Sequence, residues 1–223
     1  LFTASHIEPC YRYRGKADDE SGHAYGQRMA NALETEILRL GADKVMAFLA
    51  EPVVGATLGA VAAETGYFTR IREICDHYGV LLILDEVMCG MGRTGSLFAC
   101  DHDQVRPDII AIAKGLGAGY QPVGAMLCSK DIYDAIATGS GFFQHGHTYL
   151  AHPVACAAAH AVLSKIIETG LPSRAAMMGD RLIQALQSAF GQHPFIGDIR
   201  GRGLFIGMEF VADRTQKTPF DPA

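Results

Sequence analysis

The sequence lacks the features that mark several large classes of protein. Its longest run of valine, leucine and isoleucine is the five-residue stretch 80–84, far short of the roughly 20 apolar residues that a membrane helix needs. Its 19 lysines and arginines are scattered among 24 acidic residues, and no basic run could bind nucleic acid or an anionic membrane surface. The sequence therefore predicts neither a nucleic-acid partner nor a membrane partner.

The six cysteines form no C-x-x-C pair, which is the spacing of many zinc and redox sites. The closely spaced pair His145 and His147 has no carboxylate or thiol beside it at ligand spacing. Several cysteines lie inside apolar segments, which is typical of reduced, buried thiols and not of a disulfide framework. We therefore expect no metal site and a cytoplasmic protein.

Because the sequence starts at Leu1 without a signal-peptide pattern and ends in a loop that contains two prolines, we expect a piece of a longer protein.

Apolar patterning predicts alternating helices and strands. Helical spacing of apolar residues predicts helices at 25–40, at 68–78 and from Pro153 to about Thr169. Short apolar runs predict strands at 45–49, 80–84, 108–113 and 123–128. The run at 80–84 has no polar alternation, as expected of a parallel strand that is covered on both faces. The alternation indicates an α/β fold with a mostly parallel sheet and helices on both of its faces.

A change of pattern near residue 170 predicts a domain boundary. After Gly170-Leu171-Pro172, a helical stripe covers 177–190, and an alternating pattern at 204–210 predicts a strand with one covered face. We therefore expect residues 1–170 to be part of a large domain and residues 171–223 to be part of a smaller α+β C-terminal domain.

Three predicted strands end in side chains that can carry out chemistry, namely Glu51, Asp85 and Lys114. Ligands of open α/β sheets bind at the carboxyl ends of the strands, so these side chains are expected around one crevice. The apolar run before Lys114 favours its neutral amine, which Schiff-base chemistry needs. A carboxylate such as Asp85 can hold a proton on the pyridine nitrogen of pyridoxal 5′-phosphate. The pair therefore favours this cofactor.

Six short motifs follow one another along the chain. They are Glu51-Pro52-Val53, Asp85-Glu86-Val87, Gly92-Arg93-Thr94-Gly95, Lys114-Gly115-Leu116, His145-Gly146-His147-Thr148 and Arg200-Gly201-x-Gly203. Their order over about residues 44–222 resembles the class III, or omega-amino-acid, aminotransferases of fold type I. The resemblance implies a partial fold type I large domain that binds the cofactor, followed by part of the small domain.

The resemblance also implies a role for each matching residue. Lys114 would hold pyridoxal phosphate as a Schiff base and then move the proton between substrate and cofactor, while Asp85 would pair with the pyridine nitrogen. Val87 would pack on the ring, and Thr148 would reach the cofactor phosphate across a homodimer interface. Glu51 resembles a glutamate that pairs with a gating arginine near the substrate. The implied reaction moves an amino group from an ω-amino acid or amine to a keto acid in ping-pong half-reactions.

Some of these residues have structural alternatives. Core packing explains Val87 nearly as well, and a helix cap is the alternative for Thr148. A structural role for Glu51 is equally open, because the arginine that it should meet is absent from the sequence. Met88 stands where many relatives carry a polar or aromatic residue that contacts the ring oxygen. Arg93 is expected to be a structural residue that makes an ion pair or orders its loop.

Two family features are missing from the sequence, namely a Gly-Ser/Thr loop for the phosphate upstream of Lys114 and a carboxylate-binding arginine near the end. We therefore expect the chain alone to bind the cofactor poorly.

Decarboxylase, aminomutase and epimerase reactions use the same cofactor residues and stay open as alternatives to amino transfer. A P-loop ATPase would need G-x-x-x-x-G-K-[ST], which does not occur. An inactive scaffold would need neither Lys114 nor Asp85.

Overall fold

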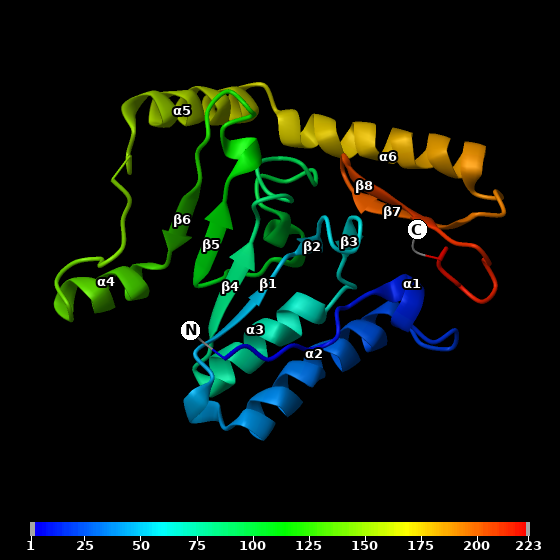
Figure 1. The fold of residues 1–223 in the computed structure, drawn as a ribbon, viewed down its shortest axis with the longest axis horizontal. Helices are drawn as coiled ribbons and strands as arrows, with labels where there is room; N and C mark the ends of the chain where they lie inside the picture. Colours follow the sequence, from blue (N-terminus) through cyan, green and yellow to red (C-terminus); the bar gives the residue numbers. More distant parts are fainter. Residues whose placement is uncertain (1–2, 222–223) are drawn as a thin grey trace.

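The computed structural model describes residues 3–221, and a four-stranded sheet with strand order β1-β4-β5-β6 lies at its centre (Figure 1). Strands β1 (Ala47–Ala50), β4 (Leu81–Asp85) and β5 (Ile109–Ile112) are parallel. Strand β6 (Ala125–Cys128) runs antiparallel to β5. The predicted α/β class, its four strands and the mostly parallel sheet are therefore confirmed.

The main core lies between this sheet and two helices, α2 (Gly22–Leu40) and α3 (Tyr67–Tyr78). Leu82 and Leu84 of β4 are fully buried in this core, whereas Leu81 and Ile83 on the opposite face of the strand are half-buried. Successive side chains of a strand point to opposite faces. The face of β4 that packs against α2 and α3 is therefore more completely buried than its opposite face. The predicted cover of β4 on both faces is thus present, with one face fully buried and the other half-buried within residues 3–221.

Glycines end the two core helices. Gly41 follows α2 with φ +94°, and Gly79 follows α3 with φ +67°, a left-handed conformation that glycine adopts without strain. At the other end of α2, the Ser21 hydroxyl accepts a hydrogen bond from the Ala24 amide at 3.1 Å and so caps the helix. The helices predicted at 25–40 and 68–78 are confirmed.

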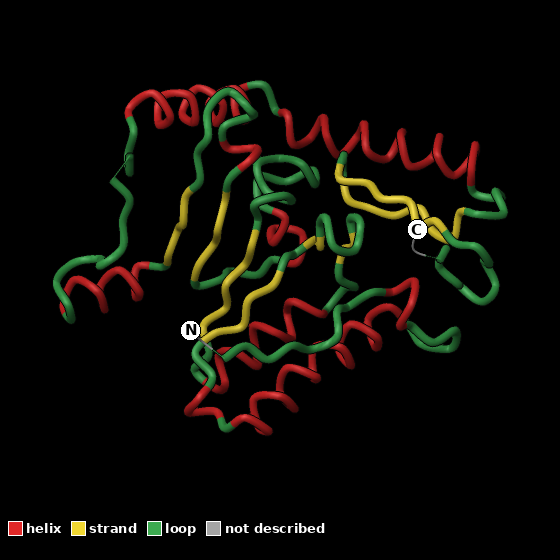
Figure 2. The backbone as a smooth tube through the Cα atoms, in the orientation of Figure 1, coloured by secondary structure: helices red, strands yellow, loops and turns green. Residues whose placement is uncertain are grey.

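Three further helices follow the sheet: α4 (Lys130–Thr138), α5 (Pro153–Glu168) and α6 (Leu171–Phe190). Figure 2 shows that the long connection between α4 and α5 runs apart from the strands. Within residues 3–221 no single helix is long and apolar enough to cross a membrane, although α5 and α6 taken together pass that test and bend by 66° at their junction. The predicted domain boundary falls at this junction and stays a prediction.

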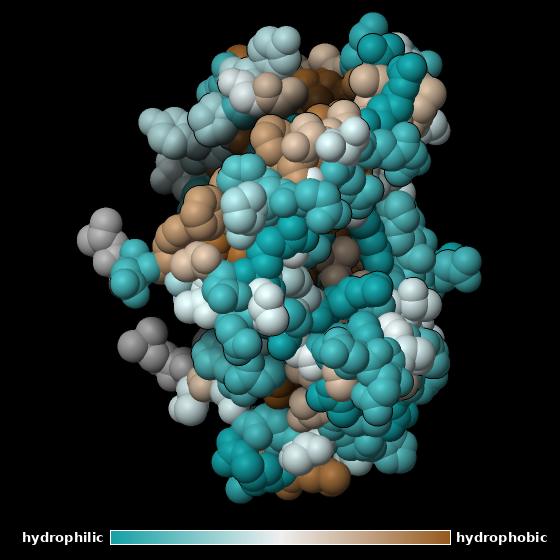
Figure 3. Space-filling model, turned by 90° about the vertical axis from the view of Figure 1, so that its right-hand side faces the viewer, coloured by the Kyte–Doolittle hydropathy of each residue, from teal (hydrophilic) through white to brown (hydrophobic). Residues whose placement is uncertain are grey.

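The C-terminal part is an antiparallel hairpin of β7 (Ile196–Arg202) and β8 (Phe205–Phe210). Strand β8 matches the predicted strand, but its residues 205–209 are all half-buried, so the expected single covered face is wrong. The reason is close packing by the neighbouring β2–β3 turn, since a Cβ at Gly207 would overlap the carbonyl oxygen of Gly59. The side of the molecule that carries the hairpin is largely hydrophilic (Figure 3).

Several short elements complete the described chain. They are α1 (Arg12–Gly15), β2 (Val53–Val54), β3 (Val61–Ala62) and the short 3-10 helices η1 (Ala42–Lys44), η2 (Ala99–Asp103) and η3 (Lys114–Leu116). Strands β2 and β3 pair as an antiparallel hairpin, which was not predicted because two-residue strands carry too few side chains for a pattern.

Helix α6 contacts the hairpin backbone at Gly179, which is buried. A Cβ at Gly179 would overlap the carbonyl oxygen of Gly203 in the β7–β8 turn. Gly203 in turn lies against the loop after β4, where its own Cβ would come within 2.6 Å of the Thr94 carbonyl carbon. The two glycines therefore allow three backbone segments to meet.

We expect Gly179→Ala to destabilise the protein, although alanine is normally favoured over glycine inside a helix by about 1 kcal/mol. The added methyl group must displace backbone, and such overpacking costs about 1–3 kcal/mol in the free energy of unfolding. Ser188→Ala, at an exposed position of the same helix, is the control and should change stability by less than about 0.5 kcal/mol. Denaturant unfolding that shows Gly179→Ala to be as stable as wild type would contradict the contact.

Candidate active site

The carboxyl ends of three adjacent parallel strands carry Glu51, Asp85 and Lys114. Glu51 directly follows β1, Asp85 is the last residue of β4, and Lys114 comes two residues after the end of β5. Leu84 pairs with Ala50 of β1, and Asp85 pairs with Ala111 of β5. The structure thus brings these residues to one edge of the sheet, as predicted, while their chemical roles stay predictions.

Lys114 has an unusual backbone conformation, with φ +38°. It begins η3, where the Leu116 amide donates to the Ala113 carbonyl at 2.9 Å and the Gly117 amide donates to the Lys114 carbonyl at 3.1 Å. A positive φ at a residue other than glycine is strained and is concentrated at functional sites. The tight turn therefore sets the direction in which the lysine leaves the strand.

Lys114 is exposed, although the apolar run before it led us to expect a shielded amine. Ile112, the last residue of β5, is buried, and the chain then enters the tight turn of η3 at Lys114. The apolar strand therefore does not enclose the Lys114 side chain within residues 3–221.

A cleft of about 1470 Å³ opens beside Lys114. The loop 115–123 forms one wall, and α5 contributes small and apolar residues to the other. Arg93 and Lys165 also line the cleft, so three cationic side chains border an otherwise mostly apolar space. Of the five predicted site residues, Lys114 alone belongs to the described lining.

The sequence drew attention to neither Lys165 nor this use of Arg93. A lysine near the end of a helix is common because it suits the helix dipole, so Lys165 carried no signal of its own. The Arg93 side chain makes no ion pair within residues 3–221, so the ion-pair alternative is not met there. Its backbone carbonyl instead accepts a hydrogen bond from the Leu204 amide at 3.0 Å, which holds the loop after β4 against the hairpin turn.

Asp85 and Val87 are both half-buried at the end of β4. The Asp85 Oδ1 atom accepts a hydrogen bond from the Val87 amide at 2.9 Å, and Oδ2 has no partner within the described part of the chain. Val87 is not among the residues of the buried core clusters, which weakens the core-packing alternative. This strand end therefore offers a fixed carboxylate and an accessible apolar side chain.

Glu86, between these two residues, points into the protein and is fully buried. Its carboxylate accepts hydrogen bonds from the amides of Ala99 at 2.6 Å and Cys100 at 2.9 Å. Burial raises the pKa of Glu86, while the two amide hydrogen bonds oppose that change. Glu86 thereby ties both ends of the loop 86–100 together and fixes the segment that contains Val87.

Glu51 is held by the turn that follows it. Its Oε2 atom accepts a hydrogen bond from the Gly55 amide at 2.9 Å. A Cβ at Gly55 would overlap the Met88 sulfur and would lie 3.2 Å from the same Glu51 Oε2 atom. Glu51 therefore lies beside the Val87–Met88 segment, and no arginine pairs with it among the described residues.

Thr148 does not join this group. It lies in the connection between α4 and α5, in which every residue from 137 to 154 is exposed. No hydrogen bond engages its hydroxyl within residues 3–221, and the residue at the N-cap of α5 is His152. The helix-cap alternative for Thr148 is therefore wrong. Among all the described residues, 3–221, no group of three or more His, Cys, Asp or Glu side chains could hold a metal ion.

Comparison with known proteins gives a consistent result. The family model for aminotransferase class-III matches residues 6–222. A Gibberella zeae protein named aminotransferase is 49% identical over 97% of this chain and 42% of its own length. Gamma aminobutyrate transaminase 2 of Solanum lycopersicum is 40% identical over 95% of this chain and 46% of its own length.

Solved structures agree with this result. A thermostable (S)-enantioselective omega-transaminase from Thermomicrobium roseum matches with a TM-score of 0.92 and 38% identity, over 98% of this chain and 48% of that one. The omega transaminase from Pseudomonas jessenii in complex with PMP matches with a TM-score of 0.90 and 36% identity, over 97% and 48%. The chain spans about half the length of these relatives. It belongs to the class III aminotransferase family.

Proposed function

We propose that the intact protein is a pyridoxal-phosphate-dependent aminotransferase that moves an amino group from an ω-amino acid or amine to a keto acid. It would work through a lysine Schiff base and two ping-pong half-reactions. The observation that carries this proposal is the placement of Lys114 and Asp85 at the ends of the adjacent strands β5 and β4. A Halomonas elongata relative named diaminobutyrate--2-oxoglutarate transaminase, 39% identical, supports an ω-amino donor and a keto acid acceptor.

The side chains at the strand ends fit the ring end of pyridoxal phosphate. When bound, this cofactor supplies an aldehyde and a ring that withdraws electrons from the substrate carbon. The primary amine of Lys114 suits the aldehyde, and the unpaired Oδ2 of Asp85 suits a protonated ring nitrogen. Val87, half-buried and outside the core, offers the ring an apolar surface.

Proton control is the main work of this chain. The Val87 amide orients the Asp85 carboxylate, which would hold a proton on the ring nitrogen through a charge-assisted hydrogen bond of about 1.5–3 kcal/mol. The Lys114 amine would take the proton from the substrate carbon and return it, a positioned transfer that contributes roughly 10²–10⁴-fold in rate. Glu51, held by Gly55, would lie on the substrate side.

The phosphate end needs residues from outside this half-site. We propose that Thr148 binds the phosphate of a second copy of the chain, in a homodimer. Its hydroxyl is unpaired in the described structure, and large apolar neighbours such as Phe142, Tyr149 and Leu150 are 64%, 82% and 67% exposed. Exposed aromatic side chains of this kind are enriched at protein interfaces. Poor cofactor binding by the isolated chain stays a prediction of this arrangement.

The division of the chain into domains and the cellular compartment of the protein are also proposals. We propose that 1–170 belongs to the cofactor-binding domain and 171–223 to the small domain, supported by the bend at Gly170, whose φ is +62°. The six free cysteines, four of them buried, support a reducing compartment such as the cytoplasm.

Borohydride reduction of the cofactor-loaded intact protein should attach the cofactor permanently to the peptide that contains Lys114. We expect Lys114→Ala to lose this label and all amino transfer. Lys165→Ala is the matched control, because Lys165 lines the same cleft, and it should keep the label. Peptide mapping by mass spectrometry that finds the label on another lysine would refute the assignment.

The reaction class can be tested by an amino-donor screen on the intact protein, with pyruvate and 2-oxoglutarate as acceptors. We expect ω-amino acids or amines to form the corresponding amino acid from at least one acceptor. The product is measured by chromatography, with Lys114→Ala as the blank. A protein that carries the cofactor but transfers no amino group from any donor would point to a decarboxylase, aminomutase or epimerase instead.

A further inference from the structure

Arg200 belongs to the motif Arg200-Gly201-x-Gly203, for which the proposed function supplies no role. Its side chain is only 13% exposed. It donates from Nε to the Gly59 carbonyl at 2.9 Å and from Nη2 to the Leu58 carbonyl at 2.6 Å. A single guanidinium thus binds two successive carbonyl groups, 142 and 141 positions earlier in the sequence.

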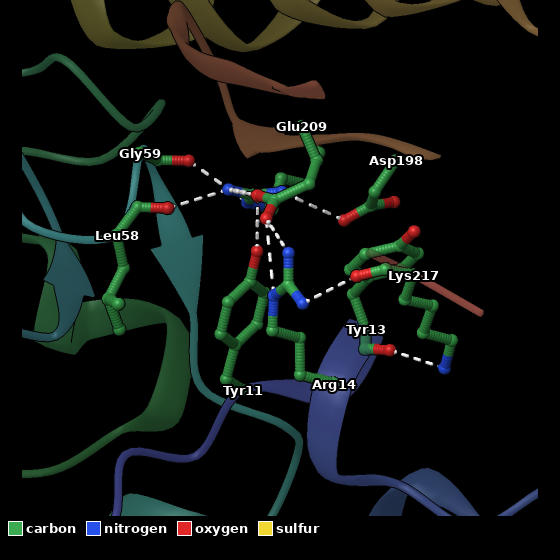
Figure 4. A network of polar contacts seen from close by, with 9 residues as sticks. Tyr11, Tyr13, Arg14, Leu58, Gly59, Asp198, Glu209 and Lys217 are labelled. Carbon is green, nitrogen blue, oxygen red and sulfur yellow. Dashed lines mark hydrogen bonds and ion pairs between the residues drawn. The ribbon is translucent and has the colours of Figure 1, made fainter. Parts of the chain in front are cut away.

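Two carboxylates on the hairpin, those of Asp198 and Glu209, pair with this guanidinium, and both residues are labelled in Figure 4. Nη2 of Arg200 lies 2.8 Å from Glu209 of β8, and Nη1 lies 3.2 Å from Asp198 of β7. Glu209 also accepts hydrogen bonds from Arg14 and from the Tyr11 hydroxyl. Burial opposes the ionisation of Glu209, but these hydrogen-bond donors outweigh it and lower the pKa of its carboxyl group. Arg200 is therefore anchored on the hairpin side.

The two carbonyl groups belong to the turn between β2 and β3. This turn closes through a hydrogen bond from the Gly59 amide to the Gly55 carbonyl at 2.8 Å. Gly59 and Ala60 have φ values of +73° and +59°, and for alanine a left-handed conformation costs roughly 1–2 kcal/mol. Such a turn needs support from its surroundings, and Arg200 supplies it.

The other end of the same turn holds Glu51. The Gly55 amide donates to Glu51 Oε2 at 2.9 Å, while the Gly55 carbonyl accepts from Gly59. An unbroken series of hydrogen bonds therefore runs from Glu209 through Arg200 and the β2–β3 turn to the Glu51 carboxylate.

We propose that Arg200 is a positioning residue for Glu51: it fixes the β2–β3 turn and thereby holds the Glu51 carboxylate on the substrate side of the site. The inference rests on the proposed function, in which Glu51 faces the substrate. Arg200 itself contacts neither the strand ends nor the cleft beside Lys114. The C-terminal hairpin would thus influence substrate binding from a distance.

Hydrogen exchange of the intact protein tests the positioning without any enzymatic activity. We expect Arg200→Met to increase exchange of the Gly55, Gly59 and Ala60 amides roughly tenfold, since hydrogen bonds to a charged group are among the stronger ones. Arg202→Met is the matched control. Arg202 lies on the same strand but contacts Asp103 at 3.2 Å and the Ala63 carbonyl at 3.3 Å, so the turn should keep its protection. Unchanged exchange in Arg200→Met, or equal increases in both variants, would overturn the proposal.

A kinetic double-mutant cycle then tests whether the effect passes through Glu51. We expect Arg200→Met to raise KM for the amino substrate roughly tenfold with little change in kcat, as loss of substrate-side binding requires. In a Glu51→Ala background, the same change should have no further effect on KM. Arg202→Met should leave KM unchanged in both backgrounds.

Full additivity of Arg200→Met and Glu51→Ala would show that Arg200 does not act through Glu51 and would overturn the proposal. The proposed function and the positioning role of Arg200 can be refuted separately. If the protein transfers no amino group with any donor, the proposed function falls, whereas the hydrogen-exchange comparison still decides whether Arg200 positions the turn.

Discussion

The parallel pairing of β4 with β1 and β5 is the constraint on which the candidate site depends. Leu82 and Leu84 are fully buried beneath α2 and α3, and this burial fixes which face of β4 each residue occupies. Asp85 shares the opposite face with Leu81 and Ile83, because side chains alternate along a strand. A slip of one residue would expose the leucines and turn Asp85 into the core. The packing of the core therefore determines where the carboxylate points.

In the proposed function, the strand ends provide half of a site. They bring an amine, a carboxylate and an apolar side chain to one edge of the sheet, which suits the ring of pyridoxal phosphate and leaves its phosphate unaccounted for. Lys114 is exposed and Thr148 stands on an exposed connection. The chain spans about half the length of its relatives, and the proposed function assigns the missing cover and phosphate contacts to other parts of the assembled enzyme.

Much of the fold could be predicted from local patterns. Neighbouring residues in the sequence were enough to predict the buried strand at 80–84 and the helix ends at Gly41 and Gly79. The positions of Asp85 and Lys114 at strand ends follow from the predicted strands. The strand β7 could not be predicted, since its sequence contains glycine at 197 and 201 and three charged residues, at 198, 200 and 202. The exposure of Lys114 was missed because it depends on the backbone turn after β5 and on which segments cover the residue.

The contacts of Arg200 lie beyond any local pattern, since they join residues more than 140 positions apart. The motif around Arg200 was visible in the sequence, but its partners became identifiable only when the hairpin was seen against the β2–β3 turn. In this structure, the C-terminal hairpin, the N-terminal segment around Tyr11 and Arg14, and the loop that holds Glu51 form one polar network (Figure 4). The C-terminal packing is thereby linked to the position of the Glu51 carboxylate.

The proposed function depends on Asp85 acting upon the cofactor that Lys114 would hold, and the ¹⁵N chemical shift of the cofactor ring nitrogen in the intact protein tests this most directly. We expect a protonated ring nitrogen in the wild type at neutral pH and an unprotonated one in Asp85→Asn, because an amide cannot stabilise the pyridinium charge. Asp131→Asn, an exposed change on α4, should leave the shift unchanged. A ring nitrogen that stays protonated in Asp85→Asn would contradict the account.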